Sequence, residues 1–183
     1  RRDIWGSIPD VMASTANFLA SSGWKAGQPW GLEVVLPPGF DYARAWDIGS
    51  QNLGQWQAMG LRRTGGRDFP RAGDAARLFL PSGSQGPAFL LVHNFDVIKR
   101  YNNSNNYALA VGHLADRILG VGGFARSFPA NETGLNKAMR TELQGLLNAR
   151  GYNVGTPDGA IGPKTRAGII AYQRANGLTP DGH

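Results

Sequence analysis

Polar and aromatic side chains are concentrated in one stretch near the middle of the chain, "RYNNSNNYALAV" (residues 100–111). Tyr101 and Tyr107 offer flat apolar faces that can pack against a pyranose ring, and each also carries a hydroxyl group. Asn102 can donate and accept hydrogen bonds toward an N-acetyl group. Two interpretations stay open, a saccharide site and a polar loop that caps a helix, for which Ser104 is the favoured cap.

Carboxylates are the groups to look for beside such a site, because cleavage of a β-1,4 glycosidic bond needs an acid that protonates the leaving oxygen. The chain has only three glutamates: Glu33 in a predicted strand, Glu132 in a loop and Glu142 on a predicted helix surface. Asp96 is the aspartate nearest the polar stretch. All four patterns favour solvated carboxylates, so we predict no catalytic acid in this sequence.

The composition of the chain excludes several other kinds of site. The absence of Cys excludes disulfides and thiolate ligands, and His93 and His113 have no partner at metal-ligand spacing, so no metal or cofactor is predicted. The net charge of +6 suits an anionic partner. No nucleic-acid-binding motif accompanies the arginines, so a nucleic-acid partner is not expected. We expect all five tryptophans to pack in the core or against loops: Trp5, Trp24, Trp30, Trp46 and Trp56.

The first two-thirds of the chain predict a mixed α+β fold. Residues 7–22 have helical periodicity, with Ser7 as cap and an apolar face that begins at Ile8. Residues 32–36, 75–80 and 87–95 predict strands of a small antiparallel sheet, the last two as a hairpin, and residues 50–59 predict a weak helix. After the polar stretch, an apolar helix face is expected from Tyr107, Val111, Leu114 and Ile118.

Composition then changes. Residues 120–134 are rich in glycine and lack periodicity, which predicts a linker. Beyond them a helix is expected with its leucine-rich face inward, and a second helix begins at Pro163. The inward residues are expected to be Leu135, Met139, Leu143, Leu146 and Leu147. Each helix is followed by a loop that contains Pro-Asp-Gly, which indicates a short internal repeat and a compact helical module.

The segment 135–183 resembles the peptidoglycan-binding type 1 family. The matching motifs are "LQGLLNARGY", "DGAIGPKT", "AGIIAYQ" and "NGLTPDG". The resemblance implies a small three-helix-type module that holds enzymes on cell-wall murein. Family members continue into a last helix after the position of the final Pro-Asp-Gly, so whether the module is complete or truncated stays open.

Residues 1–119 resemble the C-terminal part of the catalytic domain in the membrane-bound lytic murein transglycosylase B family. The matching motifs are "RRDIWGSIPDVMASTANFLASSGWKAGQPWG", "NLGQWQAMGLRR" and "HNFDVIKRYNNSNNYALAVGHLADRI". The resemblance implies a lysozyme-like fold. It also implies cleavage of the MurNAc-GlcNAc β-1,4 bond with formation of 1,6-anhydromuramic ends, a carbon-oxygen lyase reaction on a polysaccharide.

The same resemblance assigns roles to the polar stretch. Tyr101 and Asn102 match a family pair that holds the sugar near the cleaved bond, Tyr107 matches a second family tyrosine, and Ser104 is either a further contact or the helix cap. The family's catalytic glutamate, and a calcium-binding loop in some members, precede the position of Arg1. We therefore expect a substrate-binding wall and a murein-binding module, with no catalytic residue, no metal site and no activity of this chain alone.

The partners that follow are peptidoglycan glycan strands, the upstream part of the same protein, and an outer-membrane association through an upstream anchor. The expected location is the periplasm or cell envelope. A non-catalytic murein-binding or scaffold protein is the alternative function, since no credible acid is present. A basic nucleic-acid binder is a third, weaker alternative.

Overall fold

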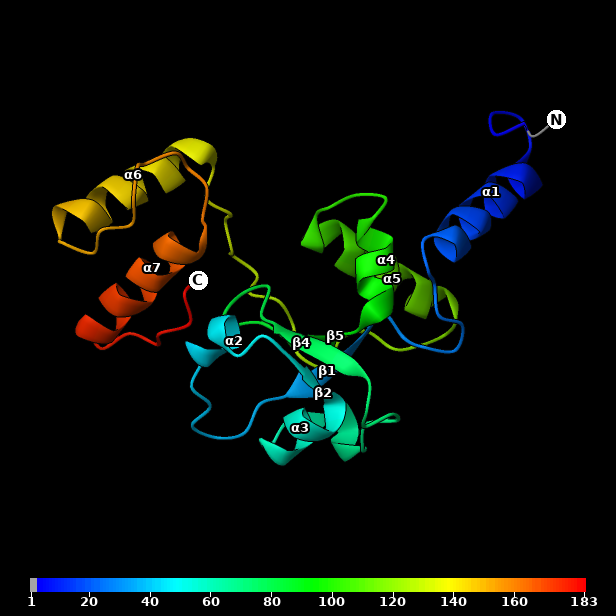
Figure 1. Ribbon diagram of the computed structural model, residues 1–183, viewed down its shortest axis with the longest axis horizontal. Helices are drawn as coiled ribbons and strands as arrows, with labels where there is room; N and C mark the ends of the chain where they lie inside the picture. Colours follow the sequence, from blue (N-terminus) through cyan, green and yellow to red (C-terminus); the bar gives the residue numbers. More distant parts are fainter. Residues whose placement is uncertain (1–2) are drawn as a thin grey trace.

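A five-stranded antiparallel sheet forms the centre of the computed structural model, which describes residues 3–183 (Figure 1). Arg1 and Arg2, which begin the predicted transglycosylase segment, lie outside the described residues. The strand order is β2-β4-β5-β1-β3, and every neighbouring pair is antiparallel. The strands are β1 (Gly31–Val35), β2 (Ser50–Asn52), β3 (Arg62–Arg63), β4 (Ala75–Phe79) and β5 (Ala88–Leu91). The predicted α+β class, small antiparallel sheet and hairpin partners β4 and β5 are confirmed.

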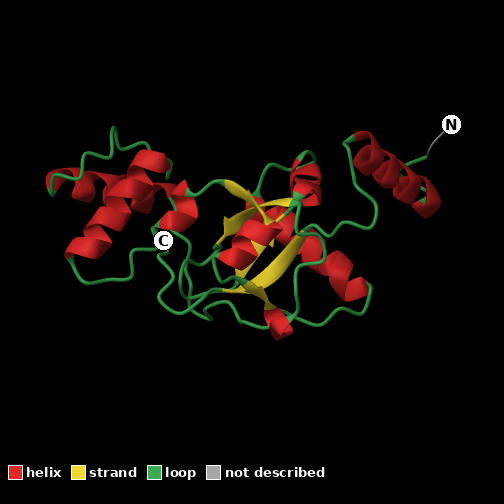
Figure 2. Cartoon of the chain, turned by 60° about the horizontal axis from the view of Figure 1, so that its bottom comes forward, coloured by secondary structure: helices red, strands yellow, loops and turns green. Residues whose placement is uncertain are grey.

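Helices lie on both faces of the sheet and at both ends of the chain (Figures 1 and 2). They are α1 (Ile8–Ser21), α2 (Arg44–Asp47), α3 (Leu53–Ala58), the 3₁₀ helix η1 (Thr64–Gly66), α4 (His93–Lys99), α5 (Asn105–Ile118), α6 (Lys137–Ala149) and α7 (Pro163–Ala175). Within residues 3–183 no helix combines the length and the apolar character needed to cross a bilayer.

The central strand β5 is buried on both faces, so the sheet separates two apolar layers. On one face, Trp56 of α3 packs with Leu32, Leu78 and Leu90 of the strands. On the other face, α4 and α5 pack on the sheet, and the central contact is between Trp30, Phe89 and Phe95. The second layer positions the polar stretch, because that stretch connects α4 to α5.

Two secondary-structure predictions need correction. Residues 50–59, predicted as one weak helix, divide into β2 and α3, and Asn52 caps α3 in a reciprocal bond with Gln55. Residues 93–95, predicted as the end of a strand, begin α4 instead. The change at Val92 has no side-chain cap, so the sequence carries no local signal for it.

The apolar faces of α1 and α5 are largely exposed. The helix α1 has no buried residue, and Ile8 is 73% exposed. On α5, Leu114 and Ile118 are 60% and 77% exposed, and the buried residues are Ala108, Leu109 and Gly112. Helical periodicity indicates that a surface has an apolar partner, but it does not place that partner within the same residues.

The C-terminal segment (residues 135–183) contains the two predicted helices, α6 and α7. The inward face of α6 differs from the prediction, because Leu135, Met139 and Leu146 are 43%, 44% and 48% exposed. Gln144 and Leu147 are the buried residues of α6. The inward position goes to a glutamine because the neighbouring loop presents backbone groups that need hydrogen-bond partners.

That glutamine reveals the internal repeat in atomic detail. Gln144 Oε1 accepts hydrogen bonds from the backbone nitrogens of Asp158 and Gly159 at 2.9 and 2.7 Å, and its Nε2 donates to Asp158 Oδ1. Gln173 of α7 does the same in the second turn, where its Oε1 accepts from Gly182 N at 2.9 Å and its Nε2 donates to Asp181 Oδ1. Each Pro-Asp-Gly turn is therefore held by a buried glutamine.

Candidate functional site

The corner between α4 and α5 presents two tyrosines side by side. Tyr101 is 70% exposed, its ring stacks on Tyr107 with centroids 6.0 Å apart, and Phe18 of α1 meets it edge-on at 5.9 Å. Tyr107 also packs against the second apolar layer of the sheet. The pair is thus anchored at one end and open at the other, as a platform for a sugar ring requires.

Asn102 and Ser104 fix the backbone of this corner. Ser104 N donates to Asn102 Oδ1 at 3.0 Å, and Ser104 Oγ accepts from Tyr107 N at 3.3 Å as the N-cap of α5. The predicted capping role of Ser104 is confirmed. The amide nitrogen of Asn102 donates to no atom of residues 3–183, so it is available to a ligand carbonyl.

The position of α5 is set by Trp30 beneath it. The Trp30 indole Nε1 donates to Asp116 Oδ2 at 2.8 Å. This bond joins the start of β1 to the C-terminal end of α5. Gly112 allows the close approach, because a Cβ atom at this position would lie 2.6 Å from the Trp30 ring. Tyr107 is therefore held by contacts of Gly112 and Asp116, which lie five and nine residues further along the same helix.

Of the carboxylates that were expected to be solvated, Asp96, Glu132 and Glu142 are exposed and Glu33 is half-buried, and all but Glu142 also have a structural partner. Glu33 accepts from the backbone nitrogens of Ala125 and Arg126 at 2.8 and 2.9 Å, and Asp96 pairs with Arg77 at 2.7 Å. Glu132 contacts His183 Nε2. Glu142 alone is exposed without a polar partner among the described residues.

Residues 120–134, predicted as a linker, have no helix or strand and are attached to the sheet. Glu33 holds their backbone, and Phe124 stacks on His113 at 3.8 Å. No group of three or more His, Asp or Glu side chains within residues 3–183 is placed to hold a metal ion.

The tryptophans differ from one another in burial. Trp30 and Trp56 are buried as predicted, at 6% and 0% exposure. The prediction is wrong for Trp5, which is 94% exposed, and Trp24 is also 37% exposed. Both flank α1, which has no buried residue and contacts Tyr101 through Phe18. Trp46 lies at the junction between the sheet and the C-terminal segment.

That junction is an interaction that sequence reasoning missed. Asp181 Oδ2 accepts from Ser84 N and Oγ at 2.8 and 2.7 Å, and the Asp181 carbonyl accepts from Trp46 Nε1 at 2.7 Å. The Arg166 guanidinium lies 3.7 Å from the Trp46 ring centroid and donates to the Gly182 carbonyl. The repeated Pro-Asp-Gly turn was the available signal, but it gave no indication of a partner on the sheet.

Electrostatics at the junction follow from these bonds. Burial raises the pKa of the Asp181 carboxyl, but the hydrogen bonds from Ser84, His183 and Gln173 outweigh burial, so the pKa lies below its ordinary value. Burial also lowers the pKa of Arg166. Asp181 is therefore ionised at neutral pH, as its role as an acceptor requires.

The family model described as a transglycosylase SLT domain matches residues 1–116. The chain belongs to this family. A model of a peptidoglycan binding domain matches residues 136–183, so the SLT domain and the murein-type segment stand in the order that the motifs indicated. None of the curated proteins matches the chain.

Solved structures extend the comparison. SltB3 from Pseudomonas aeruginosa, in complex with NAG-NAM-pentapeptide, is 50% identical over 100% of this SLT chain, with a TM-score of 0.90. The match covers 49% of the SltB3 chain, so the present chain spans about half the length of that protein. SltB1 from the same organism is 26% identical over 66% of this chain and 41% of its own, with a TM-score of 0.51. A TM-score of 0.90 over the whole chain requires the sheet and the C-terminal segment to superpose together.

Proposed function

We propose that this chain is part of a lytic murein transglycosylase that cleaves the MurNAc-GlcNAc β-1,4 bond and leaves 1,6-anhydromuramic ends. Residues 1–119 form the C-terminal part of the catalytic domain, residues 120–134 the linker and residues 135–183 the murein-binding module. The observation that supports this proposal most is the similarity to SltB3 over the whole of the present chain, since SltB3 was solved with NAG-NAM-pentapeptide.

In this proposal Tyr101 and Tyr107 form the wall on which a pyranose ring packs. Asn102 donates through its unpartnered amide nitrogen to an N-acetyl carbonyl. Ser104 contributes by holding the corner, since its hydroxyl already accepts from Tyr107 N. The chain supplies the substrate-binding wall, and the catalytic glutamate belongs to the upstream part of the protein.

The exposed apolar faces support an upstream partner. Ile8 and Met12 on α1, and Leu114 and Ile118 on α5, have exposed fractions of 60% or more. Large exposed apolar side chains that share one helix face often mark an interaction surface. We propose that the upstream part of the transglycosylase covers them.

The finer assignments are also proposals. The family motifs in residues 1–119 and 135–183 support three of them. These are membership of the membrane-bound lytic transglycosylase B family, the carbon-oxygen lyase class, and a periplasmic or envelope location. An upstream lipid or membrane anchor would agree with that family. The alternative, a non-catalytic murein-binding or scaffold protein, is favoured by the structural partners of Glu33, Glu132 and Asp96.

Purified murein sacculi separate these functions. This chain should be retained on the sacculi and release no soluble product, whereas the longer protein that contains it should release anhydro-muropeptides detected by mass spectrometry. Ordinary reducing-end products would contradict the lyase assignment. Retention without any product from the longer protein would favour the scaffold, and retention on DNA in place of murein would exclude both.

A further inference from the structure

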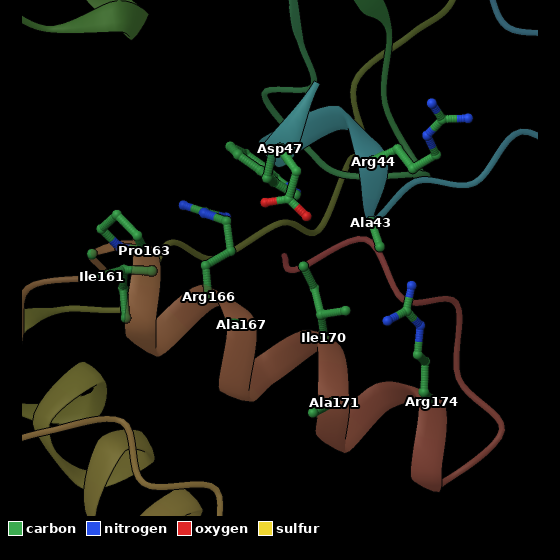
Figure 3. A pocket seen from close by; sticks show the side chains of 12 residues that line it. Ala43, Arg44, Asp47, Ile161, Pro163, Arg166, Ala167, Ile170, Ala171 and Arg174 are labelled. Carbon is green, nitrogen blue, oxygen red and sulfur yellow. The ribbon is translucent and has the colours of Figure 1, made fainter. Parts of the chain in front are cut away.

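A crevice of about 360 Å³ lies between α2 and α7, with one wall from the sheet segment and the other from the C-terminal segment (Figure 3). Its size lies within the range of small-ligand sites. Arg166, Ile170 and Arg174 follow one another along α7 at intervals of four residues, so they share one face of the helix. Figure 3 shows Arg166 and Arg174 extending from α7 toward α2, with Ile170 between them.

Positive charge dominates the lining. Three arginines, Arg44, Arg166 and Arg174, line the crevice together with one aspartate, Asp47. Arg44 makes no side-chain hydrogen bond or ion pair within residues 3–183 and stands on α2, opposite α7. Figure 3 shows its guanidinium directed away from α7, so it reaches a ligand in the crevice by a change of rotamer. Arg174 has only a distant partner, an Asp41 oxygen at 3.7 Å. Two cations at this crevice therefore have capacity for a further anion.

Of the neighbouring carboxylates, Asp41 lies 3.7 Å from Arg174, and Asp47 lines the crevice without a side-chain hydrogen bond or ion pair among residues 3–183. Asp181 lies close to Arg166, but its oxygens already accept from Ser84, Gln173 and His183. Guanidinium groups bind carboxylates through charge-assisted hydrogen bonds, and Arg is well suited to such pairs.

The apolar lining favours a peptide over a sugar. Ile161, Ala167 and Ile170 provide aliphatic surface, which suits small aliphatic side chains. The one tryptophan in the crevice, Trp46, is already covered by Arg166 at 3.7 Å, so its ring face is not free to stack on a pyranose.

We propose that this crevice binds the terminal carboxylate of a murein stem peptide, with Arg44 and Arg174 as the carboxylate-binding groups. The inference rests on the proposed function, because it takes murein as the ligand. It adds a peptide-recognition site, at the junction of the two segments, to the saccharide wall formed by Tyr101 and Tyr107. One murein unit would then be recognised through its glycan and through its peptide at separate places.

Two synthetic stem pentapeptides test the proposal, one with a free terminal carboxylate and one with a terminal carboxamide. Neither carries a sugar, so neither depends on the tyrosine platform. NMR titration of this chain should give roughly tenfold tighter binding of the acid than of the amide. The Arg44→Gln, Arg174→Gln double variant should lose that preference. Arg67→Gln, which removes one positive charge outside the crevice, is the control, because Arg67 is exposed, and it should keep the preference.

The outcomes separate the crevice from the wider function. Equal binding of acid and amide, no saturable binding of either, or a preference kept by the double variant would overturn the crevice assignment. If the chain is still retained on murein sacculi in those cases, the proposed function stands without it. If retention on sacculi fails as well, the proposed function fails too. Unchanged circular dichroism and melting temperature show that the variants are folded.

Discussion

The Asp181 carboxylate accepts two hydrogen bonds from Ser84, a residue 97 positions earlier in the chain. Both residues are buried, at 6% and 9% exposure. Asp158 occupies the same place in the first Pro-Asp-Gly turn, yet it makes no bond to the sheet segment. One turn of the repeat is therefore closed on itself, and the other also holds the C-terminal segment against the sheet.

Replacement of Asp181 should release the C-terminal segment. In Asp181→Ala, Ser84 N and Gln173 Nε2 lose a buried acceptor, which should cost about 1–3 kcal/mol of docking free energy. Small-angle X-ray scattering should then report a larger radius of gyration. Asp158→Ala is the matched control, because it removes the equivalent carboxylate without touching the sheet. Equal expansion of the two variants would contradict the docking role.

Acid should weaken the same contact. The pKa of Asp181 is lowered in the folded protein, so its contribution to stability is present above the unfolded pKa and is lost as pH falls through the folded value. The difference in unfolding free energy between wild type and Asp181→Asn should be constant from neutral pH to about pH 5 and should shrink below about pH 4. Urea unfolding at a series of pH values measures it, and a difference that grows in acid would refute the assigned direction.

Loss of the exposed tyrosine should weaken saccharide binding. Tyr101→Ala removes the open ring of the platform, and a loss of up to about tenfold in affinity for a soluble murein oligosaccharide is expected from the contribution of ring stacking. Ser104→Ala should lower the melting temperature, since loss of an N-cap costs about 1 kcal/mol, and should leave the affinity close to that of wild type. Calorimetric titration separates the two effects, and an unchanged affinity in Tyr101→Ala would remove the platform from the site.

Two helix glycines should respond in opposite directions to alanine. A Cβ at Gly112 would meet the Trp30 ring at 2.6 Å, so Gly112→Ala should destabilise the protein by about 1–3 kcal/mol and displace α5. Gly145 of α6 has no atom within 4 Å of such a Cβ, so Gly145→Ala should be stabilising by about 0.5–1 kcal/mol. Thermal unfolding gives the melting temperatures of both variants. Similar values would show that the Trp30 ring moves aside for the added methyl group.

Local signals predicted much of the fold. Ser7 and Ser104 were expected as helix caps and are caps. The β-branched run of β1 and the apolar run of β5 were expected as strands of an antiparallel sheet. These features depend on neighbouring residues, so a single sequence contains them.

Features that depend on distant partners were not predictable in the same way. Leu147 is buried as expected, but Leu146 was also expected inward because apolar periodicity was taken as burial, whereas a loop that needs hydrogen bonds selects Gln144. The junction of Ser84, Trp46 and Asp181 joins three positions that no local pattern connects. The crevice between α2 and α7 depends on that junction, so it could not be predicted from local sequence patterns either.

The separation of 97 residues between Ser84 and Asp181 also has a consequence for the order of assembly. Closing a loop of this length costs chain entropy before any bond forms, so long-range contacts of this kind are late events in folding. The sheet and the paired helices α6 and α7 can each form from contacts closer in sequence. Docking through Asp181 should therefore be the last step, and the crevice between α2 and α7 would exist only in chains that have completed it.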